Sequence, residues 1–282
     1  MLDPLPQGKW SRRAADHLLS RLAFFGSPDQ REALYQLGKN SGVAAAVDSL
    51  IDPPTDWNAW PFPAWTATEQ ELLSNHQTGN AYSTFGRWYM DHLLGATPAA
   101  GKMVKFWLDH YACTTDMVMT DPERVLYMFQ HVEIIRNSAM GNAKTLANNI
   151  YKGGMLIFML DLHVSSVGAV NENFGRELLE LFTVGVDGGY TEQDVAACAA
   201  AFTGHRLDYY NYPYAYYYDP AKADMTEKAF LGTTVVTGDD AMDAIFARIE
   251  CAHHLCWKIW RYFAGPDPSE ALLQALYPPF SQ

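Results

Sequence analysis

Four charged side chains crowd one short segment of the sequence, NENFGRELLELFT (171–183). They are Glu172, Arg176, Glu177 and Glu180. Two carboxylates that converge in a cleft can act as general acid and base, or they can bind a hard divalent cation through oxygen. An arginine beside them would orient one carboxylate and balance its charge. The segment therefore raises two hypotheses, an acid–base pair and a carboxylate metal site.

A helical wheel of 173–183 separates an apolar side from a charged side. The apolar side holds Phe174, Leu178, Leu181 and Phe182. The charged side covers an arc of about 100° and holds Asn173, Arg176, Glu177 and Glu180. The simplest interpretation is a helix that shows its charges to water and buries Leu178 and Leu181 in the core. The spacing also allows Arg176 to bridge Glu172 and Glu180, each one helical turn away.

Turn and capping signals follow this segment directly. Gly185 suits the C-cap of the helix, and the run DGG (187–189) suits a tight turn. Thr191 and Asp194 then resemble a capping box, with Asp in place of the usual Glu, at the start of a helix predicted over 192–203. The short turn would hold Asp194 near the charged helix.

Other residues have types that are used in catalysis or metal binding. Asp109 and His110 lie in a predicted helix, where His110 is either a ligand or base, or a core histidine bonded to the backbone. Asp161 and His163 precede the charged segment without a telling spacing. The run CAHHLC (251–256) holds soft metal ligands, but its spacing does not match a structural zinc site.

Tyrosines recur with period two in YYNYPYAYYYD (209–219), the one β-like segment of the chain. They are Tyr210, Tyr212, Tyr214, Tyr216 and Tyr218. One face of an extended strand would then be all tyrosine, with FLGTTVVTG (230–238) as its partner strand. Tyrosines on such a face either stack on sugar rings or pack over the core. Tyr212, Tyr214 and Tyr216 are therefore candidate binding residues in a ribbon insertion over 209–238.

The composition argues against several classes of function. The 282 residues include 20 Lys and Arg against 32 Asp and Glu, a formal net charge of -12. This charge argues against a nucleic-acid partner and against a basic membrane-surface helix. No apolar run approaches the roughly 20 residues of a membrane span, and the first residues lack the apolar core of a signal peptide. The common nucleotide, zincin and serine-hydrolase motifs are also missing from the sequence.

Helical spacing dominates the rest of the chain and predicts an all-α fold, a single domain over 1–282 with a small β-ribbon insertion. Ser27 and Pro28 open a helix predicted to end at Leu37, before Gly38. Further helices are predicted over 11–25, 43–51, 68–75, 86–94, 99–111, 122–137, 140–152, 154–163, 239–250 and 253–263.

The charged segment resembles the signature of the bacterial domain-of-unknown-function family 1800. The similar positions are Asn171–Phe174, Arg176–Leu181, Thr183, Gly185, Tyr190–Thr191, Asp194–Val195 and Thr203–Gly204. The stretches 17–28, 106–111, 136–142, 224–232 and 258–263 are also similar to family segments. Asp109 and Ala223 stand where Asn and His are usual. The resemblance spans nearly the whole chain and implies a chain truncated at its C-terminus, since family members are usually longer.

The resemblance implies that the charged face is turned inward, toward His110 and the helix that begins near Thr191. One function that follows is a hydrolase-like enzyme with an extracellular or envelope substrate. In it Glu177 and Glu180 would be acid–base or metal-binding groups. The sequence allows a divalent metal but identifies no cofactor. His110 would be a base or ligand in the same small pocket as Glu177, and Arg176 the orienting charge.

The alternative function is a non-catalytic binding or assembly component of exported or envelope machinery. Its signature would be a structural polar network, and its Tyr and Trp surfaces would contact a glycan or an envelope protein. Asn171, Glu172, Asn173 and Asp194 are the candidate binding residues of the signature in this interpretation. The sequence leaves both functions open, and with them the cellular location.

Overall fold

Helices make up most of the structure, a computed structural model that describes residues 5–24, 26–51, 56–59, 78–95, 97–113, 122–208 and 216–280. The α-helices are α1 (Arg12–Leu22), α2 (Pro28–Ser41), α3 (Val43–Ile51), α5 (Thr78–Gly95), α6 (Pro98–His110), α7 (Pro122–Ser138), α8 (Ala143–Tyr151), α9 (Gly154–Met159), α10 (Asn173–Glu177), α11 (Glu192–Ala201), α12 (Gly238–Phe246), α13 (Ile249–Ala264) and α14 (Glu270–Phe280). The predicted all-α fold class is confirmed. The predicted helix over 68–75 lies outside the described residues.

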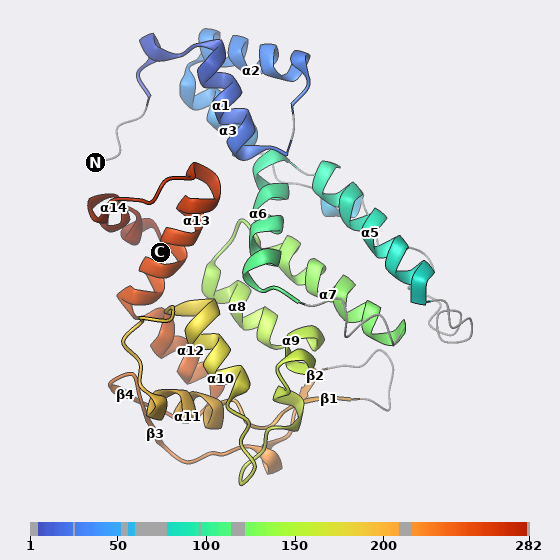
Figure 1. The fold of residues 1–282 in the computed structure, drawn as a ribbon, viewed down its shortest axis with the longest axis vertical. Coiled ribbons are helices and arrows are strands. Elements are labelled where there is room, and N and C mark those ends of the chain that lie inside the picture. The colour runs from blue at the N-terminus through green and yellow to red at the C-terminus, as the bar shows by residue number, and fades with distance from the viewer. Residues whose placement is uncertain are drawn as a thin grey trace.

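Figure 1 shows α1–α3 as a cap at one end of the molecule, above α6 and α13. The cap has an apolar cluster of its own, built from Ala15, Leu19, Ala23, Leu34, Ala46 and Leu50. A larger cluster runs through the rest of the fold, from Trp88 on α5 to Leu255 on α13. Among the described residues, no helix has both the length and the apolar character needed to cross a bilayer.

The start of α2 agrees with its predicted cap, but its end does not. Ser27 and Gln30 form a capping box, and Pro28 takes the first helical position. The helix then continues through Gly38 and ends at Ser41. A Cβ on Gly38 would lie 2.4 Å from the indole of Trp10, so this glycine makes room for the tryptophan. Gly42, with a φ of 102°, ends the helix instead.

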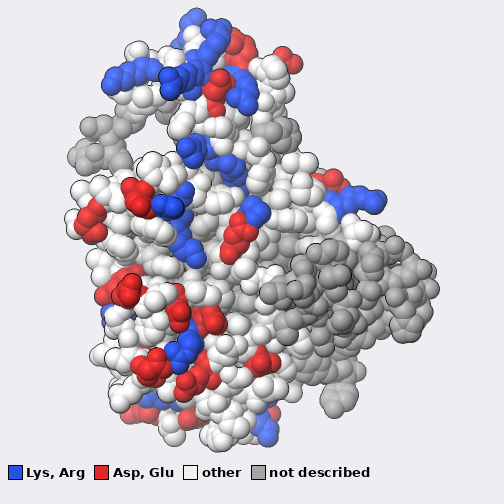
Figure 2. Space-filling view, viewed as in Figure 1, with Lys and Arg blue, Asp and Glu red and all other residues white. Residues whose placement is uncertain are grey.

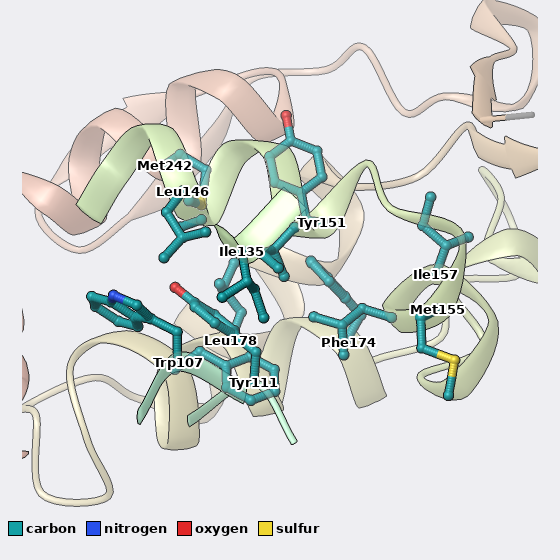
Figure 3. Close-up of a cluster of buried hydrophobic side chains, with 14 of the residues drawn as sticks. Trp107, Tyr111, Ile135, Leu146, Tyr151, Met155, Ile157, Phe174, Leu178 and Met242 are labelled. Carbon is teal, nitrogen blue, oxygen red and sulfur yellow. The ribbon is translucent and has the colours of Figure 1, made fainter. Parts of the chain in front are cut away.

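The signature segment is an α-helix that widens into a π-helix. The α10 helix (Asn173–Glu177) continues into a π-helical segment, Leu178–Thr183, in which Val184 N donates to Leu179 O. Phe174 and Leu178 point into the main core, as Figure 3 shows. The predicted burial of Leu181 is wrong, because its side chain is 45% exposed. A π-turn holds more residues than a 3.6-residue turn, so positions after Leu178 rotate away from the predicted face.

The strands form two separate antiparallel hairpins. In one, β1 (His205–Leu207) pairs with β2 (Tyr216–Tyr218), and in the other β3 (Lys228–Phe230) pairs with β4 (Thr233–Val235). The prediction that the tyrosine strand pairs with 230–238 is therefore wrong, because each segment finds a nearer partner in the chain. Tyr212 and Tyr214 lie outside the described residues. Tyr216 is half-buried, whereas Tyr217 and Tyr218 are exposed.

Candidate functional site

Asn171 and Asn173 fix the entry into the signature helix. The side-chain oxygen of Asn171 accepts a hydrogen bond from Asn173 N (2.9 Å), a local cap of the first turn. Asn171 N donates in turn to Ser165 Oγ (3.1 Å), and Ser165 is fully buried. Asn171 is therefore bonded into the fold, while Glu172 and Asn173 are exposed.

Arg176 joins α10 to α11, and it also pairs with Glu172 one helical turn away, as predicted. Its guanidinium donates to both carboxylate oxygens of Glu192 (3.0 and 2.6 Å), at the start of α11. A second carboxylate, that of Glu172, lies 3.5 Å away. The predicted bridge from Arg176 to Glu180 is therefore replaced by one to Glu192, because the 184–191 turn folds α11 back against α10. A bidentate pair of this kind fixes the geometry between two elements.

The charged face does not turn inward as predicted. The exposed fractions of the side chains are 50% for Glu172, 35% for Arg176 and 76% for Glu192. Figure 2 shows acidic side chains gathered over the part of the surface where Figure 1 draws α10 to α12.

Glu177 and Glu180 stay close enough to influence each other. Burial raises the pKa of Glu177, the negative charge of Glu180 raises it further, and Arg176 opposes both effects. Both side chains are half-buried. A carboxyl group with a raised pKa beside a second carboxylate is the arrangement that acid–base catalysis uses, but structural pairs show it too.

His110 is sealed behind the signature helix. It is 4% exposed, and its Nε2 donates to the carbonyl of Phe182 (3.0 Å). Burial lowers the pKa of His110 to about 3, and the positive charge of Lys258 adds to this. The imidazole is therefore neutral at physiological pH, with its Nε2 proton held by a backbone carbonyl. This matches the core-histidine interpretation.

The pocket predicted to hold both His110 and Glu177 stays a prediction, and different charges act on the two side chains. The charges that act on His110 come from Lys258 and His254, whereas those that act on Glu177 come from Glu180 and Arg176. Among the described residues no hydrogen bond or ion pair joins the two side chains. His110 meets the end of the π-helix, and Glu177 shares the outer face with Arg176.

A second histidine, His254 of the CAHHLC run, binds the same end of the segment. His254 on α13 lies with its Nε2 3.4 Å from the carbonyl of Leu181, and its ring centroid is 6.5 Å from that of His110. The last carbonyls of a helix lack intrahelical donors. Two histidines from α6 and α13 therefore supply donors to neighbouring carbonyls at the end of the π-helix.

Asp194 closes the motif on its far side. Its carboxylate accepts from Thr191 N (2.8 Å) in the predicted capping box, and from Leu231 N (2.7 Å) between β3 and β4. Burial opposes its ionisation, but the hydrogen bonds from Leu231 and Thr191 outweigh burial and lower its pKa. Asp194 thus ties α11 to the second hairpin.

We expect Asp194→Ala to lower the free energy of unfolding by about 1–2 kcal/mol at pH 7, the usual cost of losing a helix cap. Because the hydrogen bonds from Leu231 and Thr191 lower the pKa of Asp194 in the fold, the contribution is complete above the ordinary aspartate pKa of about 3.9 and disappears as the pH falls through the lower folded pKa. Urea titrations at pH 7 and pH 3 measure both effects. Asp187→Ala, at an exposed position of the same turn, is the control and should change little. Equal losses in the two variants would contradict the capping role.

Gly175 is a further signature residue that the sequence analysis did not single out. A Cβ on Gly175 would lie 2.8 Å from Ala199 N and 3.1 Å from Ala199 Cα. The missing side chain lets the backbones of α10 and α11 touch. The signal in the sequence was the glycine between two helix-forming residues, Phe174 and Arg176, because glycine is disfavoured in a helix interior without such a reason.

Tyr216 is bonded to the fold and not held free for a ligand. Its hydroxyl lies 3.0 Å from His205 Nδ1 on the paired strand. The ring of Tyr216 also stacks on that of His205, with centroids 5.6 Å apart. Of the three candidate glycan-binding tyrosines, the one that the structure describes therefore has a packing role.

A cavity of about 610 Å³ lies beside the turn that follows the signature helix. Its lining includes Gly185, Asp187, Glu250, His253, His254 and Glu270. His253 Nε2 lies 3.7 Å from a carboxylate oxygen of Glu270. In the described part of the chain, no three His, Cys, Asp or Glu side chains are grouped so that they could hold one metal ion. Glu177 and Glu180 do not line this cavity.

The sequence of the chain matches one protein-family model over nearly its whole length. A family model described as "Protein of unknown function (DUF1800)" matches residues 17–282. The chain belongs to this family. Comparisons with curated proteins and with solved structures found no match. The description of the DUF1800 family names no reaction.

Proposed function

We propose that this DUF1800 protein is a non-catalytic binding or assembly component whose signature is an internal clasp. The supporting observation is that the signature's polar side chains bond to the protein itself. Asn171 caps α10, Arg176 holds Glu192, and Asp194 caps α11 while it accepts from Leu231 N. Thr183 adds a fully buried hydroxyl that donates to Leu178 O (2.6 Å).

The elements that this clasp connects explain why it would be useful in a binding protein. It joins α10 to α11 through Arg176 and Glu192, and α11 to the second hairpin through Asp194. His110 and His254 then tie the end of the π-helix to α6 and α13. A rigid centre of this kind presents surrounding surfaces in a fixed arrangement, which lowers the ordering cost of binding a partner.

His110 lacks the properties of a general base in this arrangement. It is buried and neutral, and its Nε2 proton is bonded to a main-chain carbonyl. A catalytic base must reach a proton on the substrate within hydrogen-bond distance. The nitrogen that could accept a proton is Nδ1, and it is buried inside the protein, where no described group bonds to it and a substrate cannot reach it.

One observation favours the alternative function, an enzyme. Burial and the charge of Glu180 raise the pKa of Glu177, which would suit a general acid beside a carboxylate. A hydrolase that used this pair would bind its substrate over the outer face of α10. The two functions therefore make opposite predictions for Glu177.

Glu177→Gln keeps the shape of the side chain and removes its charge. We expect the melting temperature to stay within about 2 °C of wild type or to rise slightly, because the charged form of Glu177 is disfavoured in the fold. We also expect no change in hydrolysis of chromogenic ester, amide and glycoside substrates. Glu227→Gln, at an exposed position outside the signature, is the matched control. Measurable hydrolysis that Glu177→Gln abolishes and Glu227→Gln retains would overturn the binding proposal in favour of the enzyme.

A further inference from the structure

An open apolar groove of about 1050 Å³ separates the α1–α3 cap from α13. Its walls are α1 and α3 on one side and the C-terminal half of α13 on the other, where Trp260 and Phe263 line it. These two aromatic side chains and Val47 of α3 are only half-buried. A groove of this size with half-exposed aromatic walls marks a binding surface more often than a plain surface does.

Two parallel rows of side chains on α1 form one edge of the groove. Ala14, Leu18 and Leu22 make the apolar row, and Arg13, His17 and Arg21 make the polar one. Within each row the residues are four apart, so each row climbs one helical turn at a time over about 12 Å. The groove therefore has an apolar floor and a cationic edge that repeat with the period of a helix.

Among the described residues, the arginines of this edge have no acidic partner in an ion pair. Arg13 and Arg21 form no ion pair with any described residue, although Arg12 and Arg31 of the same cap pair with Glu32 and Asp16. The guanidinium of Arg21 lies toward Gly265, just after α13. Among the described residues of the groove lining, Asp48 on α3 is the one with a carboxylate.

The cap also differs in charge from the body of the protein. Residues 1–51 hold 6 of the 20 Lys and Arg residues but only 5 of the 32 Asp and Glu residues. Figure 2 shows Lys and Arg side chains gathered at the end of the molecule where Figure 1 draws α1–α3. A strongly acidic chain thus places beside its apolar groove two arginines that form no ion pair within the described residues.

We propose that this groove binds an amphipathic helix of another protein, with an acidic row beside its apolar face. Apolar side chains of that helix would enter between α1, α3 and α13, and carboxylates one turn apart would meet Arg13 and Arg21. The helical spacing of the edge favours a helix over a lipid, because a single anionic headgroup would meet only one end of a row about 12 Å long. The inference rests on the proposed binding role and specifies its partner.

Fluorescence anisotropy with two labelled helical peptides tests this proposal on the full chain. The acidic probe carries Glu at i, i+4 and i+8 with Leu one position after each, and the basic probe replaces each Glu by Lys. We expect the acidic probe to bind at least about tenfold more tightly than the basic one at 0.15 M salt. The double variant Arg13→Glu, Arg21→Glu should reverse this preference, and Val47→Asp should weaken both probes.

Lys9→Glu with Lys39→Glu is the matched control, because it makes the same charge change at exposed positions outside the groove lining. It should shift either dissociation constant less than about threefold. Circular dichroism shows whether each variant keeps its helical content, and a variant that loses it is replaced by Arg13→Gln with Arg21→Gln.

Three results would overturn the proposal. They are equal or absent binding of the two probes, binding to phosphatidylglycerol vesicles that needs Arg13 and Arg21 while the acidic probe does not bind, and self-association that the double variant abolishes. The last two would assign the groove to a membrane or to a second copy of this chain. None of these results changes the outcome expected for Glu177→Gln. The groove proposal can therefore fail while the proposed function stands, and the proposed function can fail on its own test.

Discussion

Leu178→Ala should lower the free energy of unfolding by about 2–5 kcal/mol, the range for a buried leucine that leaves a cavity. Leu178 is 3% exposed and lies in the cluster of Figure 3 with Phe174 and Ile135. Its neighbours are large and come from several helices, so the core has little freedom to close the gap. A urea titration followed by far-UV circular dichroism measures the loss.

Leu181→Ala is the matched control, because it makes the same substitution three residues later in the same π-helical segment. The side chain of Leu181 is 45% exposed, so we expect a change within about 0.5 kcal/mol. A large loss at Leu181 together with a small one at Leu178 would show that the segment turns the other face to the core. It would indicate that residues 178–183 form a regular α-helix and not a π-helix.

Gly175→Ala should also destabilise the protein, by about 1–3 kcal/mol, although alanine is normally the better helix former. The new methyl group would meet the backbone nitrogen of Ala199 at 2.8 Å. Backbone atoms cannot move aside as the end of a flexible side chain can, so α10 and α11 must separate. The same separation would strain the Arg176–Glu192 pair. Thermal and urea unfolding measure the effect.

Gly86→Ala on α5 provides the opposite expectation for the same substitution. Apart from the backbone of α5 itself, no atom of the described residues would lie within 4 Å of a Cβ on Gly86. The helix propensity of alanine should therefore stabilise the protein by about 0.5–1 kcal/mol. If Gly175→Ala stabilised the protein as Gly86→Ala does, the close approach of α10 and α11 would be refuted.

Local signals in the sequence predicted local structure well. Ser27 and Thr191 were assigned as helix caps, and both cap their helices through side-chain hydrogen bonds. The fold class followed from helical periodicity for the same reason, since an amphipathic pattern reports directly on which side of a helix is buried. The predicted end of α2 is wrong because Gly38 makes room for the indole of Trp10 and does not end the helix.

The candidate site depended on contacts between distant residues, which the sequence pattern does not report. Arg176 has a possible partner one turn away in Glu180, but the chain reversal brings Glu192 into a better bidentate position. A helical wheel drawn at 3.6 residues per turn cannot predict a π-helical segment. In this segment the side chain of Leu181 lies at the surface. His110 was identified as a signature neighbour, yet its partner is a carbonyl, which leaves no trace in the sequence.

The signature and the groove therefore have different roles in the proposed function. The clasp formed by Arg176, Glu192 and Asp194 would hold the centre of the fold, and the groove beside Arg13 and Arg21 would face a partner. This division explains how a family-defining motif can be rich in charge without a catalytic role. It also places the surface to be tested for partner binding on the α1–α3 cap, away from that motif.

The most direct test of the clasp is a pair of urea titrations at pH 7 on Asp194→Ala and Glu177→Gln. Each carboxylate oxygen of Asp194 accepts a hydrogen bond from a backbone N–H group. The fold disfavours the charged form of the Glu177 carboxyl group. The account predicts that Asp194→Ala loses about 1–2 kcal/mol while Glu177→Gln keeps wild-type stability or gains slightly. Wild-type stability in Asp194→Ala, or a larger loss in Glu177→Gln, would contradict it.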